Sequence, residues 1–324
     1  MSDILVKQGS PRAPVTPVVG EHRTYPSVSA SLELLKPITW FAPMWAFLCG
    51  AVSSGAGFGA HWVFVAVGII LAGPLVCGMS QAVNDWFDRH VDALNEPNRP
   101  IPSGRIPGRW GLYIAIFWTG VSLAVAATLG SWVFGATLIA SALAWAYSAP
   151  PFRLKENGWW GNAACGLCYE GLAWFTGAAA LLGALPNGQI IALAVLYSIG
   201  AHGIMTLNDF KAIDGDRQMG VRSLPVQLGI HNAARLASLV MALPQVVVIA
   251  LLWSLGLGFY AWLVAAVLLV QLGLMAHYLL NRESLEQNPW RNAALYNATG
   301  TTAYVIGMMV AAFGLRFLAT GGAI

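Results

Sequence analysis

Long apolar segments recur along this chain and leave few ways for it to fold. A helix needs about 20 apolar residues to cross a bilayer, and nine segments approach that length. They cover 36–54, 61–83, 111–129, 131–147, 161–183, 188–207, 233–256, 259–280 and 293–318. Only 10% of the residues are charged, against about 25% in a soluble domain. Because lipid leaves backbone groups unpaired outside a helix, we expect an all-α, polytopic membrane protein with about nine transmembrane helices in a bundle.

Lysine and arginine are confined to alternate connections between these segments. They precede or open the first segment and follow the second, fourth, sixth and eighth, whereas the opposite connections hold none and only Arg316 falls on that side. Positive charge marks the cytoplasmic side of membrane proteins. We therefore expect the amino terminus and the charged loops in the cytoplasm and the carboxyl terminus in the periplasm, across an inner or intracytoplasmic membrane. This pattern accounts for the net charge of +3 without a nucleic-acid partner.

The first 30 residues differ from the rest of the chain. They are rich in serine, proline and charge and contain no apolar core of a signal peptide. We expect a flexible cytoplasmic tail over 1–30 and a single transmembrane domain over 31–324.

An acidic cluster, NDWFDRHVD, ends the second apolar segment. Asp85, Asp88 and Asp92 are spaced so that they share one face if the helix continues. Three carboxylates near a helix C-terminus repel one another and oppose the helix dipole, so a cation between them would be stabilising. Oxygen ligands suit Mg²⁺, and Asn84 adds a neutral one. We predict that these four residues bind metal; the alternative is a solvated acidic helix end.

A second acidic cluster, NDFKAIDGDR, follows the sixth segment. Asp209 and Asp216 are seven residues apart and would share a helix face, Asp214 would lie off that face, and Gly215 would bend the chain. We predict Asp209, Asp214 and Asp216 as metal ligands; the alternative is a salt-bridged loop that neutralises itself. The candidates of this segment that contact substrate are Asn208, Lys211 and Arg217.

Bases in two further loops on the same side suit a diphosphate. Arginine binds phosphate oxygens through two parallel hydrogen bonds, and Mg²⁺ held by carboxylates usually reaches a substrate's phosphates. The candidates are Arg99 and Arg105 after the second segment, and Tyr147, Ser148, Arg153 and Lys155 after the fourth. The sequence thus predicts a metal–diphosphate site at the membrane surface. The rival is a carboxylate-lined cation transporter, whose site would lie nearer the bilayer midplane.

These segments resemble a known family. The NDxxDxxxD motif, the second aspartate-rich segment and the nine apolar segments are similar to the UbiA-type intramembrane prenyltransferases. The longer segments NDWFDRHVDALNEPNRPIPSGRI, YSAPPFRLKENGWWGN and NDFKAIDGDRQMGVRSLPVQLG look like the chlorophyll synthase branch. With CGMSQAVNDWFDRH they look most like the bacteriochlorophyll synthases of purple phototrophs. Asp214 departs from that branch, which commonly has glutamate there.

The resemblance implies a reaction and a site. The propionate of bacteriochlorophyllide, or of chlorophyllide, would be esterified by geranylgeranyl or phytyl diphosphate with release of diphosphate; a quinone precursor is the alternative acceptor. The bundle would enclose a central cavity that opens sideways to lipid and is capped by cytoplasmic loops, and other membrane proteins of pigment biosynthesis would be partners. Two Mg²⁺ ions would be held by Asp85, Asp88, Asp92, Asp209 and Asp216. The leaving group would be neutralised by Arg99, Lys155, Lys211 and Arg217.

Two polar residues inside apolar segments are further candidates. An acid at membrane depth marks function more often than packing, so Glu170 is expected to order a water, pair with a cation or meet the polar edge of the tetrapyrrole; a satisfied packing contact is the alternative. His202 precedes Asp209 by seven residues and is a candidate ligand of the pigment's magnesium; the alternative is a hydrogen-bonded core histidine. Cys165 and Cys168 form a C-x-x-C that we interpret as packing residues.

Overall fold

The apolar segments form helices throughout residues 24–322, the part of the chain that this computed structural model describes. The first half contains α1 (Val28–Leu34), η1 (Pro37–Thr39), α2 (Phe41–Ser53), α3 (Phe58–Ile70), η2 (Leu71–Cys77), α4 (Gly78–Asn95), α5 (Trp110–Leu129), α6 (Ser131–Ser148) and η3 (Leu154–Glu156). The second half contains α7 (Gly158–Gly166), η4 (Leu167–Leu172), α8 (Ala173–Leu182), α9 (Gly188–Asn208), η5 (Asp209–Lys211), α10 (Ile213–Met219), α11 (Leu224–Leu228), α12 (Ile230–Ser254), α13 (Gly258–Tyr278), α14 (Arg282–Gln287) and α15 (Pro289–Ala319).

The prediction of an all-α bundle is confirmed. An isolated bridge between Asn157 and Arg222 is the only β-type pairing within 24–322. Most of the tail predicted over 1–30 lies outside the described residues, and residues 28–30 already form the start of α1.

The number of spans is smaller than expected. Seven helices of the described chain are long and apolar enough to cross a membrane, or eight if α1–η1 and α2, which are bent by 57°, count as one span. The segment 131–147 does form a helix, α6, but this helix is not among them. The count of nine is therefore not confirmed, whereas a multi-pass membrane protein is.

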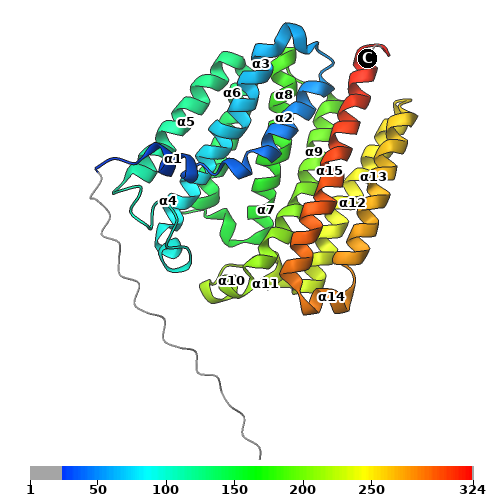
Figure 1. Cartoon of the computed structure of the whole chain (residues 1–324). Coiled ribbons are helices and arrows are strands. Elements are labelled where there is room, and N and C mark those ends of the chain that lie inside the picture. The colour runs from blue at the N-terminus through cyan, green and yellow to red at the C-terminus, as the bar shows by residue number, and fades with distance from the viewer. Residues whose placement is uncertain (1–23, 323–324) are drawn as a thin grey trace, which may run out of the picture.

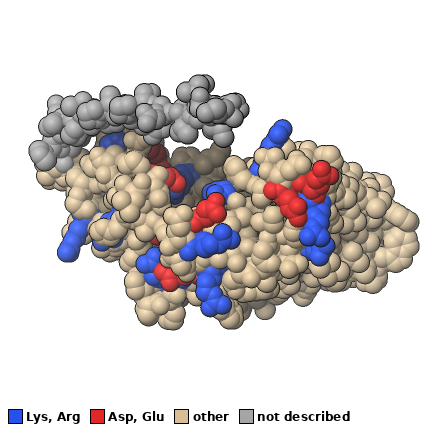
Figure 2. Space-filling view, turned by 90° about the horizontal axis from the view of Figure 1, so that it is seen from below, with Lys and Arg blue, Asp and Glu red and all other residues tan. Residues whose placement is uncertain are grey.

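The connections separate into two groups at opposite ends of the bundle (Figure 1). α10, α11 and α14 lie at one end together with the loop after α4, and the end of α15 lies at the other. Figure 2 views the molecule from the first end and shows charged side chains around a hollow in a mostly uncharged surface. The acidic and basic residues predicted to share one side of the membrane belong to this end.

Glycines let the helices at the centre approach closely. A Cβ added to Gly50 of α2 would lie 1.9 Å from the backbone oxygen of Trp174 in α8, and one added to Gly177 would lie 2.0 Å from that of Phe47. The two backbones can approach this closely only because glycine has no side chain. Close backbone packing of this kind stabilises helix pairs in a membrane, where no hydrophobic effect drives them together. The α2–α8 pair therefore forms a rigid centre to which other helices attach.

Two spans contain π-helical segments. η2, which includes Pro74, joins α3 to α4, and η4 joins α7 to α8. An inserted π turn adds a residue to the turn and changes which side chains share a face, and it often marks a functional site. Both segments contribute residues to the cavity described next.

Candidate active site

A cavity of about 780 Å³ lies between the helices of the bundle. Its walls come from α2, η2, α4, α6, η4, α8, α9 and α15, and they are mostly apolar. At one end the lining becomes polar and charged, with Lys36, Asn84, Arg99, Asn208, Asp209 and Lys211. Residues from both acidic clusters, which are more than 120 positions apart in the chain, thus line a single cavity.

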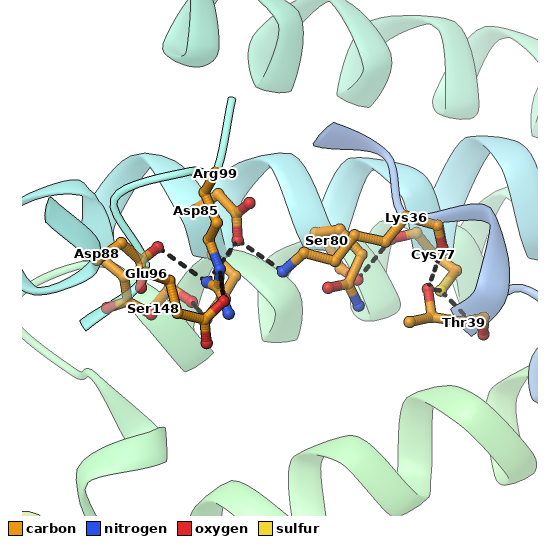
Figure 3. A network of polar contacts seen from close by, with 12 residues as sticks. Lys36, Thr39, Cys77, Ser80, Asp85, Asp88, Glu96, Arg99 and Ser148 are labelled. Carbon is orange, nitrogen blue, oxygen red and sulfur yellow. Dashed lines mark hydrogen bonds and ion pairs between the residues drawn. The ribbon is translucent and has the colours of Figure 1, made fainter. Parts of the chain in front are cut away.

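The first cluster stands on a helix that continues to Asn95, as predicted. Asp85 is 1% exposed, and Figure 3 shows two bases approaching it. Lys36 Nζ lies 2.7 Å from Asp85 Oδ1, and Arg99 Nη1 lies 3.4 Å from the same oxygen and 2.9 Å from Asp92 Oδ2. Arg99 also pairs with Glu96 at 2.5 Å. The loop after α4 is thereby fixed against the helix that it follows.

Asp88 faces a different loop. Lys155 donates a hydrogen bond to Asp88 Oδ1, and Arg153 lies 4.0 Å from that oxygen. Asn84, one turn earlier, donates to Ser148 Oγ at 3.3 Å. Burial lowers the pKa of Lys155, although the Asp88 carboxylate opposes this shift. The loop that follows α6 is thus held over the same helix from its other side.

This arrangement differs from the expected convergence of three carboxylates on one spot. Each of Asp85, Asp88 and Asp92 is paired with a base, and no group of three or more acidic, histidine or cysteine side chains in residues 24–322 is arranged to hold a metal. The physical reason is the bases themselves. Arg99 and Lys155, which we expected to contact only phosphate, lie between the acids and screen their repulsion.

The second cluster does not form one continuous helix. α9 ends at Asn208, η5 covers Asp209, and Ala212 has φ −116° and ψ 8°, so the chain breaks there and not at Gly215, which lies inside α10. The expectation that Asp209 and Asp216 share a helix face is therefore wrong. Asp209 is held instead by Asn162, whose Nδ2 donates to Asp209 Oδ2 at 3.2 Å.

Two residues of this cluster point away from the cavity. The side chain of Asp214 is 90% exposed and lies 3.8 Å from Arg217, which is itself 66% exposed. Neither residue lines the cavity, so this part of the segment matches the alternative reading of a salt-bridged loop. Asp216 is partly buried, and this burial raises the pKa of its carboxyl group.

Other predicted residues divide between the cavity and the surface. Tyr147 and Glu170 line the cavity. Arg105 instead forms a two-pronged pair with Glu33 near the surface, with contacts of 2.5 and 2.7 Å. His202 packs against the Trp159 ring, with centroids 6.0 Å apart, and its buried Nδ1 has no hydrogen-bond partner. It does not line the cavity, and its role as a pigment ligand stays a prediction.

Lys36 is the site residue that the sequence reasoning missed. We used it only as a cation that sets topology, yet it lines the cavity and pairs with Asp85. Its backbone has φ 46°, a left-handed conformation rare for a residue with a side chain. The only signal in the sequence was the proline that follows it, since this proline disfavours helix at Lys36.

Comparisons with known proteins agree with this geometry. Residues 42–298 match the model of the UbiA prenyltransferase family. The chain is 58% identical to the bacteriochlorophyll synthase 33 kDa chain of Cereibacter sphaeroides, across 91% of this chain and 96% of that one. It is 37% identical to the chloroplastic chlorophyll synthase of Oryza sativa, across 87% and 75%. Its fold is similar to that of a UbiA homologue from Archaeoglobus fulgidus bound to DMAPP and Mg²⁺, with a TM-score of 0.63, 22% identity and coverage of 86% and 99%.

Proposed function

Because this chain belongs to the UbiA prenyltransferase family, we propose that it is a bacteriochlorophyll synthase. It esterifies the propionate of bacteriochlorophyllide with geranylgeranyl or phytyl diphosphate and releases diphosphate. The observation that carries the proposal is the cavity, whose remaining walls are mostly apolar. Its charged end combines Asn84 of the first acidic cluster and Asn208, Asp209 and Lys211 of the second with the bases Lys36 and Arg99. The 58% identity to a bacteriochlorophyll synthase supports this acceptor over chlorophyllide, whose synthase is 37% identical.

The chemistry follows from these two environments. The bond between the allylic carbon and the diphosphate oxygen breaks, and the diphosphate leaves with the electron pair. A propionate oxygen then forms the new ester bond to that carbon, so no protein nucleophile is needed. Apolar walls exclude the water that would otherwise capture the carbon.

The charged end of the cavity fits Mg²⁺. Its donors are oxygens, and Asp85 Oδ2 is buried with no hydrogen-bond partner. Mg²⁺ is usually held by only one or two carboxylates together with substrate phosphates, so the scattered acids are sufficient. Asn84, Asp88, Asp209 and Asp85, through its unpartnered Oδ2, are the residues that would hold the ion, or two ions. When bound, Mg²⁺ supplies positive charge to the diphosphate oxygens and makes diphosphate a better leaving group.

The bases at this end bind and orient the same group. Arg99 and Lys211 line the cavity, and Lys155 lies beside Asp88. They neutralise the charge that grows on the leaving diphosphate, which is the main electrostatic contribution that a site of this kind can make. Asp92 and the Oδ1 atom of Asp85 also hold the guanidinium of Arg99 in place through ion pairs. Ser148 and Arg153 orient the proposed metal ligands, since Ser148 accepts a hydrogen bond from Asn84 and Arg153 lies near Asp88. Asn208 lines the cavity and is held by Asn297.

The proposal places the charged end at the cytoplasmic surface of an inner or intracytoplasmic membrane, where diphosphates and Mg²⁺ are available. The alternating lysine and arginine loops support this orientation, with the carboxyl terminus in the periplasm. Other pigment-biosynthesis membrane proteins are the proposed partners that deliver the acceptor from the bilayer.

A competition assay tests the function. Purified protein in detergent is given Mg²⁺, one prenyl diphosphate and equal amounts of bacteriochlorophyllide and chlorophyllide, and both esters are quantified. We expect mainly the bacteriochlorophyllide ester together with one diphosphate released per ester. Mainly chlorophyllide ester would reassign the acceptor, and cation flux in reconstituted vesicles without any ester would favour the transporter.

A further inference from the structure

Glu170 is a buried acid that the reaction described above does not use. It is 4% exposed and lines the cavity. Its Oε2 has no hydrogen-bond partner, and no ion pair within residues 24–322 includes it. A buried polar group without a partner is destabilising, and acids at membrane depth are kept where they act on a ligand or pathway. The structure therefore offers no packing reason for this carboxyl group.

The π-helical segment η4 gives Glu170 a different neighbourhood from Tyr169. Tyr169 OH accepts a hydrogen bond from Gln81 Nε2 of α4 at 3.0 Å, so its hydroxyl is already partnered. Glu170, the next residue of η4, has no such partner. Tyr169 and Glu170 both line the cavity, so η4 places one partnered and one unpartnered polar group in its wall.

The cavity opens to the outside beside η1, the start of α2 and α15. Ile38 and Phe41 line the cavity and are 90% and 59% exposed, and Thr302 on α15 is another exposed lining residue. Exposed apolar side chains on membrane helices face lipid. A flat and largely apolar molecule dissolved in the bilayer can therefore enter through this opening the cavity that Glu170 lines.

The chemistry of the two substrates distinguishes them at this position. A prenyl tail is pure hydrocarbon and offers nothing to a carboxyl group. The tetrapyrrole macrocycle carries carbonyl groups at its edge, which accept hydrogen bonds. Burying an ionised carboxylate with no cation beside it is far more unfavourable than burying the neutral acid, so Glu170 can donate through its O–H.

We propose that Glu170 donates a hydrogen bond to a carbonyl group at the edge of the tetrapyrrole and so holds the acceptor in the cavity. This inference rests on the proposed function, since it assumes that the acceptor is a pigment.

Pigment binding to the purified full chain tests the inference without requiring turnover. The shift of the bacteriochlorophyllide absorbance band on titration gives a dissociation constant for the wild type, Glu170→Gln and Glu170→Leu. Gln retains a donor at similar reach, so we expect its dissociation constant within about threefold of the wild type. Leu removes the donor, and we expect binding about tenfold weaker, the value of one ordinary hydrogen bond. The KM for prenyl diphosphate should not change in either variant.

Two further measurements separate a binding role from a structural one. Glu170→Leu removes an unpartnered buried group, so we expect the thermal midpoint of the ligand-free protein to stay the same or rise. The matched control is Ser141→Ala in α6, because Ser141 Oγ is also buried without a partner but does not line the cavity. We expect it to leave pigment affinity unchanged.

The inference would be overturned if Glu170→Leu bound the pigment with wild-type affinity. It would also be overturned if this variant had a lower thermal midpoint and lost affinity equally for the pigment and for prenyl diphosphate. If the wild type binds pigment with the expected dependence on residue 170 but forms no ester, the proposed function fails and the inference stands. If no pigment binds to the wild type, both fail.

Discussion

At the scale of single residues, the site is organised by ion pairs between distant segments. Asp85 and Asp88 lie one turn apart on α4, but the bases that pair with them come from distant segments. Lys36, which pairs with Asp85, precedes α2, and Lys155, which pairs with Asp88, lies in the loop after α6. Residue type and spacing predicted which residues gather at this end of the bundle. They did not predict which base meets which acid, because such pairs depend on loop conformations such as the left-handed Lys36.

Replacing Asp88 with asparagine should reduce kcat/KM at least about a hundredfold, the scale of losing one preorganised electrostatic contact in an active site. The change removes a proposed metal ligand and the partner of Lys155. Diphosphate release in the presence of Mg²⁺ is the measurement. Asp214→Asn is the matched control, because Asp214 lies at the surface in a pair with Arg217, and we expect activity within about twofold of the wild type. Equal losses of kcat/KM in both variants would contradict a diphosphate site that includes Asp88 and excludes Asp214.

Replacing Lys36 with methionine should destabilise the protein by on the order of 3 kcal/mol, because it leaves the buried Asp85 with only the more distant Arg99. Unfolding monitored by circular dichroism in detergent measures this effect. Arg105→Gln breaks the exposed pair with Glu33, and we expect a change of less than about 1 kcal/mol. If both variants lose the same free energy of unfolding, the burial of the Lys36–Asp85 pair does not increase its contribution to stability.

At the scale of helices, the apolar pattern predicted where elements lie but not how they deviate from a regular helix. The single residue Gly130, with φ 120°, separates α5 from α6, and this boundary is readable as a short glycine turn. The π segments η2 and η4 and the break at Ala212 are not readable, since a period of 100° per residue assumes an uninterrupted helix. This assumption is why the predicted shared face of the second cluster is wrong.

Gly50→Ala should lower the thermal midpoint, because its Cβ would meet the backbone of Trp174 and force α2 away from α8. Overpacking of this kind is destabilising by about 1–3 kcal/mol. Gly120→Ala in α5 has nothing within 4 Å of the new Cβ and should leave stability unchanged or slightly higher. A midpoint for Gly50→Ala at or above that of Gly120→Ala would show that the contact is easily relieved.

At the scale of the whole molecule, the central prediction from sequence concerned the relation between the two acidic clusters. Alternating charged loops indicated that both lie on one side, and the structure has residues of both in the lining of one cavity. That the cavity opens sideways could be stated only through family resemblance, because helix order in space does not follow from hydropathy.

Chelation should remove activity while leaving pigment binding intact, since the residues that would hold the ion do not include Glu170, the proposed contact of the pigment. Ester formation after treatment with EDTA, and again after Mg²⁺ is restored, is the measurement, with pigment absorbance recorded in parallel. Full activity in excess EDTA would exclude a divalent ion from the reaction. Loss of pigment binding along with activity would show that the two ends of the cavity are not independent.

The lipid-facing position of Ile38 and Phe41 at the opening has a consequence for kinetics. For an acceptor that enters there, the effective concentration is its ratio to lipid and not its amount per litre of solution. Adding detergent micelles or lipid at constant amounts of enzyme and pigment should therefore dilute this substrate, while the dependence on the water-borne magnesium ion stays the same.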